Sequence, residues 1–282
     1  MGEISAAVAM IYPELAWELG SGTSARHAFT LSSEGDIVLR RLTERWWRRA
    51  PRADATWEYF PARQPSPEAV LEIAGQKFDS RDWRFALGVD DGRLVLDLRA
   101  YHPVLGRLPQ KERPRAGFIA SDQIFGEDAV EKWFGRLEFP DKLPPGAGPA
   151  SEVFETMRRM AEESKKEIFI VAQGHDERRR PLFLSFNQRV KRLDHLFAVN
   201  MFQLEVPFLH ADSRGLPAPD GNRLLDEFED RVLEAARGAV YVGRRTGGGR
   251  RRWFFYAEDG KAVSDRLTGL VQSDSRWTAD VS

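Results

Sequence analysis

The order of apolar segments in the second half of the chain constrains the fold more than any other feature. From Leu196 onward, an apolar segment is followed by an amphipathic helix at residues 222–237, and then by two strands joined through a glycine-rich turn. A second helical stripe around Leu267 and a short apolar segment at residues 277–281 complete the pattern. The order strand, helix, strand, strand, helix, strand predicts a split βαβ sheet. We therefore expect an antiparallel sheet with helices on one face.

The helix at residues 222–237 has the clearest periodicity in the chain. Leu225, Phe228 and Val232 fall on one stripe, and Gly238 follows the last turn, as is common where a helix ends. This pattern supports an α+β, ferredoxin-like arrangement for the C-terminal half. The opposite side of the helix is acidic, with Asp226, Glu227, Glu229, Asp230 and Glu234.

The length of the chain favours two domains. A chain of 282 residues exceeds the usual size of a single domain. Residues 140–150, which read PDKLPPGAGPA, have the composition of a linker. We predict an N-terminal α+β domain at residues 1–140 and a C-terminal ferredoxin-like domain at residues 151–282, which opens with a helix.

The first half mixes helices with antiparallel strands. Residues 83–89 and 94–98 alternate apolar with other side chains on either side of Asp91-Gly92, which predicts a hairpin with a two-residue turn. A helical stripe predicts a helix over residues 36–49. We also expect a buried strand at residues 117–120, a short helix at residues 127–134 and a strand at residues 136–139.

Composition excludes several classes of function. Lys and Arg number 42 and Asp and Glu 43, so the net charge of -1 provides no global attraction to nucleic acid or membrane. The absence of cysteine removes thiol nucleophiles and cysteine-ligated metals. Glu3 and Pro13 do not fit a secretory signal, and no apolar run is long enough for a membrane helix. We expect a cytoplasmic protein, and the excess of Arg over Lys is typical of a bacterial one.

The densest basic feature is the predicted hairpin over residues 240–257. Its sequence RRRWFFY resembles the strand on which an RNA recognition motif carries stacking aromatics, but it lacks the glycine of that motif. Alternation sends Trp253 and Phe255 to one face and Phe254 and Tyr256 to the other, so one pair is needed for the core. Arginine at a hairpin tip is also common as plain edge protection. The candidate binding residues are Arg244, Arg245, Arg250, Arg251, Arg252, Trp253 and Tyr256.

Other candidate sites have structural explanations. The glycines at residues 247–249 join two strands, whereas phosphate-binding loops join a strand to a helix. The sequence Arg45-Trp46-Trp47-Arg48-Arg49 could stack on bases, but Trp46 continues a buried stripe, so we interpret the segment as core packing. The acidic cluster complements a helix dipole and the histidines lack metal-ligand spacing, so we predict no metal, no cofactor and no catalytic residues. These residues are Asp122, Glu127, Asp128 and Glu131, and His27, His102, His175, His195 and His210.

The C-terminal half resembles the bacterial domain of unknown function, family 695, whose fold relative is the regulator of ribonuclease E activity B. The resemblance rests on residues 214–260, RGLPAPDGNRLLDEFEDRVLEAARGAVYVGRRTGGGRRRWFFYAEDG. It implies a ferredoxin-like α+β fold without established chemistry, and the better-known relative acts by binding a protein. This chain lacks the strongly acidic character of that relative and carries an additional N-terminal half.

Three hypotheses on function follow. The leading one is a non-catalytic module that binds another protein, because the fold order is clear and catalytic motifs are absent. The second is binding of RNA or single-stranded nucleic acid through residues 250–256. The third is an enzyme with an interdomain cleft that involves His102, His195 or Glu205.

Overall fold

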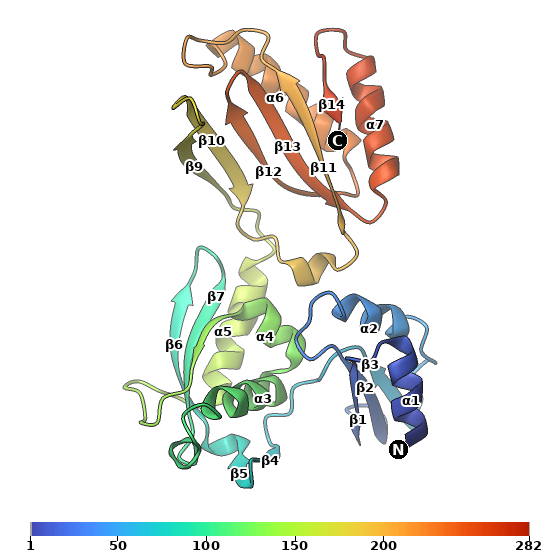
Figure 1. The fold of residues 1–282 in the computed structure, drawn as a ribbon, viewed down its shortest axis with the longest axis vertical. Coiled ribbons are helices and arrows are strands. Elements are labelled where there is room, and N and C mark those ends of the chain that lie inside the picture. Colours follow the sequence, from blue (N-terminus) through green and yellow to red (C-terminus); the bar gives the residue numbers. More distant parts are fainter. Residues whose placement is uncertain (1, 282) are drawn as a thin grey trace. The chain divides into compact units, whose positions relative to one another are not determined.

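The computed structural model describes residues 2–281 and divides into two compact units, Met1–Lys165 and Lys166–Ser282 (Figure 1). Helices and sheets occur in both units, so the predicted α+β class is confirmed. None of the helices within residues 2–281 is long and apolar enough to cross a membrane.

The first part of the N-terminal unit is a small sheet with two helices. Strand β2 pairs antiparallel with β1 and parallel with β3, and α2 connects the two parallel strands. Leu31 and Leu39 are buried between the sheet and the helices, with Trp46 packed against them. The elements are α1 (Gly2–Ile11), β1 (Ala16–Ser21), β2 (His27–Ser32), α2 (Arg40–Trp47) and β3 (Trp57–Phe60).

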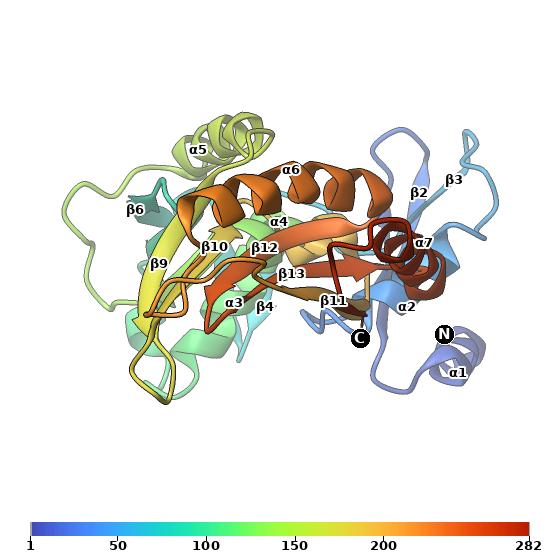
Figure 2. The same cartoon turned by 90° about the horizontal axis from the view of Figure 1, so that it is seen from above.

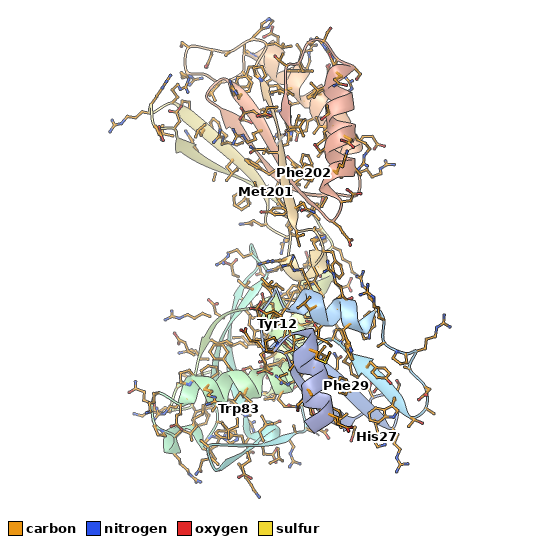
Figure 3. All side chains as sticks on the ribbon, turned by 45° about the vertical axis from the view of Figure 1, so that its right-hand side comes forward. Tyr12, His27, Phe29, Trp83, Met201 and Phe202 are labelled. Atoms are coloured by element: carbon orange, nitrogen blue, oxygen red, sulfur yellow. The ribbon has the colours of Figure 1, made fainter. Side chains whose placement is uncertain are left out.

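The second part of the N-terminal unit has a larger core. Trp83, Phe85 and Phe125 are buried there, in the core formed with a three-stranded sheet and the neighbouring helices. Figure 3 labels Trp83. The elements are β4 (Val70–Ile73), β5 (Gln76–Asp79), η1 (Ser80–Asp82), β6 (Arg84–Asp90), β7 (Val95–Tyr101), η2 (Leu105–Arg107), α3 (Arg113–Phe125), α4 (Glu127–Trp133), β8 (Phe134–Glu138) and α5 (Ala150–Glu163).

Helix α5 lies in the N-terminal unit. Its residues Val153, Met157 and Met160 recur on one face and are buried in the same core as Trp83. We expected a boundary at residues 140–150, whereas the compact units meet at Lys165 and Lys166. The apolar face of α5 explains the difference, because that face needs the N-terminal core for burial.

Two sequence predictions in this unit are wrong. Residues 117–120, predicted as a buried strand, belong to α3, which begins with Pro114 in its first turn. The hairpin of β6 and β7 does form, but Asp90 pairs with Val95, so its loop has four residues. Leu94, expected in the second strand, adopts a positive φ of 49° in that loop and is fully buried.

The C-terminal unit is a six-stranded sheet in the order β14-β11-β13-β12-β10-β9, in which all neighbours are antiparallel. We call the face that α6 and α7 cover the inner face and the opposite one the outer face. Figure 2 shows α6 over β12 and β13. The elements are β9 (Phe169–His175), β10 (Pro181–Asn187), η3 (Arg192–His195), β11 (Asn200–Pro207), α6 (Pro219–Ala235), β12 (Val240–Gly247), β13 (Arg250–Ala257), α7 (Gly260–Gln272) and β14 (Asp280–Val281).

The core of the C-terminal unit lies between the inner face and the two helices. Phe202 and Leu204 of β11 and Phe255 of β13 meet Leu225 of α6 and Leu267 of α7. Among the described residues, β9 and β10 contribute no side chain to this core. The β9–β10 hairpin therefore extends the sheet beyond the area that the helices cover.

Candidate functional site

The arginine-rich hairpin consists of β12 and β13 and forms as predicted. Its turn is Gly248-Gly249, with φ of 67° and 84°. A two-residue turn that matches the twist of a hairpin needs positive φ at both positions, which glycine adopts without a steric penalty. The turn fixes the register, so the charged and aromatic residues of β13 alternate between the two faces.

The inner pair of hairpin aromatics belongs to the core. Trp253 and Phe255 have no exposed surface, and Trp253 packs edge-on against Phe228 of α6. Phe254 and Tyr256 point to the outer face and keep part of their surface exposed. Trp253 was a candidate binding residue, and its burial removes it from any surface contact. Tyr256 remains accessible.

Arg251 lies near the beginning of β13, and its buried, positively charged side chain is on the inner face of the sheet. Its side chain is 3% exposed, and it donates to Asp226 Oδ1 at 2.7 Å, to Asn222 Oδ1 at 2.9 Å and to Thr246 Oγ1 at 3.2 Å. Glu229, itself buried, lies 3.2 Å from the same guanidinium. Two acidic residues of α6 thus compensate a charge that burial would otherwise make costly.

Arg244 shares the carboxylate of Glu229 with Arg251. Burial disfavours the charged form of Arg244, but the hydrogen bond to Glu229 and the charge of that carboxylate together outweigh burial and raise the pKa of the guanidinium. The hydroxyl of Tyr241 donates to Glu229 at 3.3 Å, and burial together with this carboxylate raises the pKa of the phenol. The acidic side of α6 therefore serves partly to anchor the hairpin.

On the outer face, Glu205 of β11 joins two further arginines. It accepts from Arg250 Nη1 at 2.6 Å and from Arg252 Nε at 2.7 Å. Burial opposes ionisation of Glu205, but the hydrogen bonds and the positive charges of both arginines together outweigh it and lower the pKa of the carboxyl group. Sequence reasoning did not find this clamp, because it depends on the register that places Glu205 opposite Arg252.

Apolar groups lie on the same face of the sheet. Met201 is 56% exposed and Leu184 is 40% exposed, and the rings of Phe254 and Tyr256 lie between their strands (Figure 3 labels Met201 beside the buried Phe202). Arg245 stands opposite Arg252 and has no ion-pair partner among residues 2–281. We refer to these residues together as the outer-face patch: Leu184, Met201, Arg245, Phe254 and Tyr256.

A groove of about 310 Å³ lies on the inner face where the helices leave the sheet uncovered. Arg244 and Arg251 lie on its floor, and Val171 of β9 lines it. Both guanidinium groups are already paired with carboxylates of α6, so the groove presents little net charge. The remaining lining residues are Phe183, Ser185, Leu216, Pro217, Asn222 and Thr246.

The acidic cluster of the N-terminal unit is a structural clamp. Glu127 is buried and accepts from Ser32 Oγ at 2.8 Å, from Ser33 Oγ at 2.6 Å and from the Gly35 amide at 3.0 Å. Burial opposes ionisation of Glu127, but these hydrogen bonds lower its pKa. Asp128 pairs with Arg40. Within the described residues, no group of three or more His, Cys, Asp or Glu side chains could hold a metal ion.

The residues considered for an enzyme have separate environments. His102 is buried against Phe78 and Trp83, and burial lowers the pKa of its imidazole. His195 is exposed on η3, and Glu205 is held by the outer-face arginines. His210 contacts Asp220 at 2.5 Å on an exposed surface.

Comparison with protein-family models matches residues 179–280 to a family of unknown function (DUF695). The predicted resemblance of the C-terminal part is thereby confirmed, and the match covers the arginine-rich hairpin and both helices of the C-terminal unit. The likeness to the regulator of ribonuclease E activity B stays a prediction. Comparisons with curated proteins and with solved structures gave no match.

Proposed function

We propose that the C-terminal unit is a non-catalytic, ferredoxin-like module that binds another protein through the outer-face patch. The order β14-β11-β13-β12, with α6 and α7 as the two connecting helices, supports the ferredoxin-like assignment because it is the order of a split βαβ sheet. The family match adds no activity to this assignment, because the family is one of unknown function.

The proposal rests on the ion pairs that already neutralise four arginines of the hairpin. Arg244 and Arg251 are paired with α6, and Arg250 and Arg252 are paired with Glu205. A phosphate ligand would have to compete with these carboxylates for every one of the four cations. The exposed groups that remain are mostly apolar or aromatic, and such groups dominate the centres of protein interfaces.

Site-specific photo-crosslinking in the native host tests this function. A photoreactive residue at Met201 is expected to capture one recurrent protein, and a Leu184→Glu substitution in the same chain is expected to abolish the capture. The matched control places the photoreactive residue at Val89, which is 38% exposed in the N-terminal unit. Equal capture at both positions, or none at Met201, would remove the proposal. Capture of a second copy of the chain would identify self-association as the interaction.

A second candidate is binding of single-stranded nucleic acid by the same face. It is favoured by Phe254 and Tyr256, which lie on the outer face of a central strand beside the unpaired Arg245. This function predicts that Tyr256→Ala weakens binding of a short RNA, and that affinity falls steeply with salt. Absence of RNA binding at low salt would eliminate it.

A further inference from the structure

A second basic and aromatic region lies in the N-terminal unit, at the end of α2. Residues 45–52 read RWWRRAPR and contain two tryptophans and no acidic residue. The four arginines of this segment are all exposed: Arg45, Arg48, Arg49 and Arg52. The chain has almost no net charge, so this is a local concentration of positive charge.

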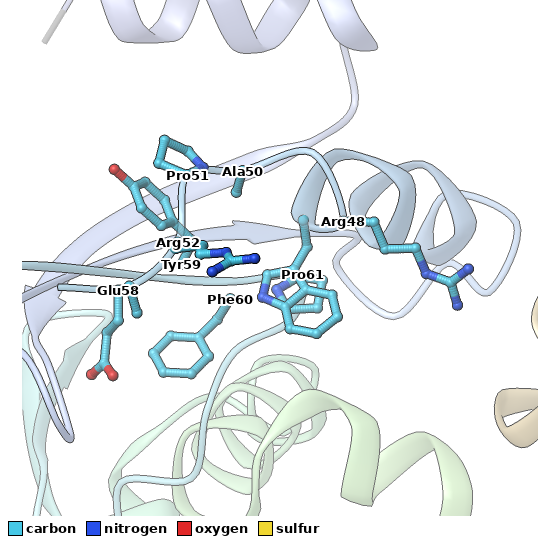
Figure 4. A pocket seen from close by; sticks show the side chains of 10 residues that line it. Arg48, Ala50, Pro51, Arg52, Glu58, Tyr59, Phe60 and Pro61 are labelled. Atoms are coloured by element: carbon cyan, nitrogen blue, oxygen red, sulfur yellow. The ribbon is translucent and has the colours of Figure 1, made fainter.

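Beside this segment lies a pocket of about 550 Å³ between the end of α2, the following loop and β3. Trp47, which is 43% exposed, lines it together with Tyr59 and Phe60. Figure 4 shows the guanidinium of Arg52 in the middle of the labelled side chains, whereas Arg48 points away from them. The rest of the lining is Ala50, Pro51, Ala53, Glu58 and Pro61.

The nearby carboxylates have other partners. Glu58 accepts from Ser24 Oγ at 2.5 Å and from the backbone and hydroxyl of Thr23, and in Figure 4 its carboxylate points away from Arg52. Glu44 is shared by Arg40 at 3.0 Å and by Arg48 at 3.2 Å. Within residues 2–281, Arg52 has no ion-pair partner, so its charge is available to a ligand.

The aromatic wall is fixed from behind by the core. Trp46 packs against Phe29 at 5.5 Å and edge-on against Tyr59 at 6.2 Å between ring centroids. This contact holds the ring of Tyr59 in place, while Trp47, the next residue, faces the pocket. Core packing therefore accounts for Trp46 and leaves Trp47 exposed beside a free cation.

We propose that this pocket binds a nucleobase–phosphate ligand, with the base stacked on Trp47 and the phosphate held by Arg52. An exposed indole next to a basic segment suits such a ligand, because every base has a face that stacks on an aromatic ring and every phosphate attracts guanidinium. The same chemistry is presented by a free nucleotide and by a single strand. The site is independent of the outer-face patch, since it lies in the other unit.

The test measures fluorescence anisotropy of a labelled oligothymidylate of about eight nucleotides with the full chain at low salt, and competition by UMP. Trp47→Ala is expected to weaken binding roughly 5- to 150-fold, the range for loss of one base–aromatic stack. Arg52→Ala is expected to weaken binding and to reduce the slope of affinity against salt by about one. Trp47→Phe, which keeps an aromatic ring, should restore much of the affinity.

Arg99→Ala is the matched control, because Arg99 is an exposed arginine of the same unit outside the pocket. An oligonucleotide that binds far more tightly than UMP identifies a strand as the ligand, and similar affinities identify a free nucleotide. The proposal is overturned if neither binds, or if polyphosphate without bases competes equally well and Trp47→Ala has no effect. It is also overturned if affinity is lost with Tyr256→Ala and not with the pocket variants.

Discussion

Arg251 shows how a single side chain can link the hairpin to α6. The guanidinium is almost completely buried and is surrounded by Asp226, Glu229 and Asn222. Charged groups in such a position are stable only while their partners remain, since an unpaired buried charge loses its hydration without compensation. The hairpin and α6 are therefore expected to unfold together.

We predict that Arg251→Met lowers the free energy of unfolding by about 1.5–3 kcal/mol, because it removes the charge-assisted hydrogen bonds of the hairpin to α6, while Glu229 keeps Arg244 and Asp226 is half-exposed to solvent. Urea denaturation of the full chain measures this change. The control is Arg223→Ala on the same helix, where the side chain is 75% exposed and the expected loss is below about 1 kcal/mol. Equal losses for the two variants would contradict a special role for Arg251.

Asp122 makes the stability of the N-terminal unit depend on pH. Burial and the nearby charge of Glu127 raise its pKa to about 6, although Arg63 opposes the shift. A carboxyl group whose pKa is higher in the folded than in the unfolded state stabilises the fold at pH values below its unfolded-state pKa. This stabilisation is lost as the pH rises through the folded-state pKa. The stabilisation from Asp122 is therefore lost between about pH 4 and about pH 6.

We predict that Asp122→Asn is more stable than the unchanged chain at pH 7 by about 2–3 kcal/mol, and that this advantage disappears at pH 4. Thermal and urea unfolding at the two pH values measure the difference. A variant that is no more stable than the unchanged chain at pH 7 would contradict the raised pKa of Asp122.

At the scale of elements, strand β9 lies at one edge of the six-stranded sheet and lacks the residues that usually keep such an edge from pairing with another chain. It has no proline and no Asp, Glu, Lys or Arg, and Val171 is 66% exposed. Backbone hydrogen bonds of Asp176 to Arg180 and of Gln188 to Ile168 fix the pairing with β10. Since bonding alternates along an antiparallel pair, the amides of residues 169, 171, 173 and 175 face away from β10.

Amide hydrogen exchange is therefore expected to alternate along β9. The amides of Ile170, Ala172 and Gly174 should exchange slowly, and those of Phe169, Val171 and Gln173 should exchange quickly. Residue-resolved exchange by NMR on the dilute protein measures the pattern. Uniform protection of all these amides would show that the edge is covered by another strand.

Sequence patterns predicted secondary structure best where a single periodicity was present. Alternation placed Trp253 and Phe255 on one face, and the structure buries both. At residues 117–120, however, four apolar residues resembled a strand, and the deciding signal was the wider spacing of Ala116, Ala120 and Ile124 along α3. The clamps at Glu205 and Glu127 could not be predicted, because their partners are far away in the sequence.

At the scale of the whole molecule, α5 decides where the chain divides. We predict that a fragment of residues 1–165 unfolds cooperatively and that a fragment of residues 1–149 is much less stable, because it lacks Val153, Met157 and Met160. Loss of one such buried side chain already costs about 2–5 kcal/mol. Circular dichroism during thermal unfolding compares the fragments. Equal stability would instead favour the linker at residues 140–150 as the boundary.

The exposed edge at β9 has a practical consequence for work with this protein. We expect two copies to pair through the unprotected backbone of β9 at high concentration, so the oligomeric state of a sample should depend on its protein concentration. A lysine in place of Val171 is the smallest change that would discourage such lateral growth while leaving the rest of the sheet as it is.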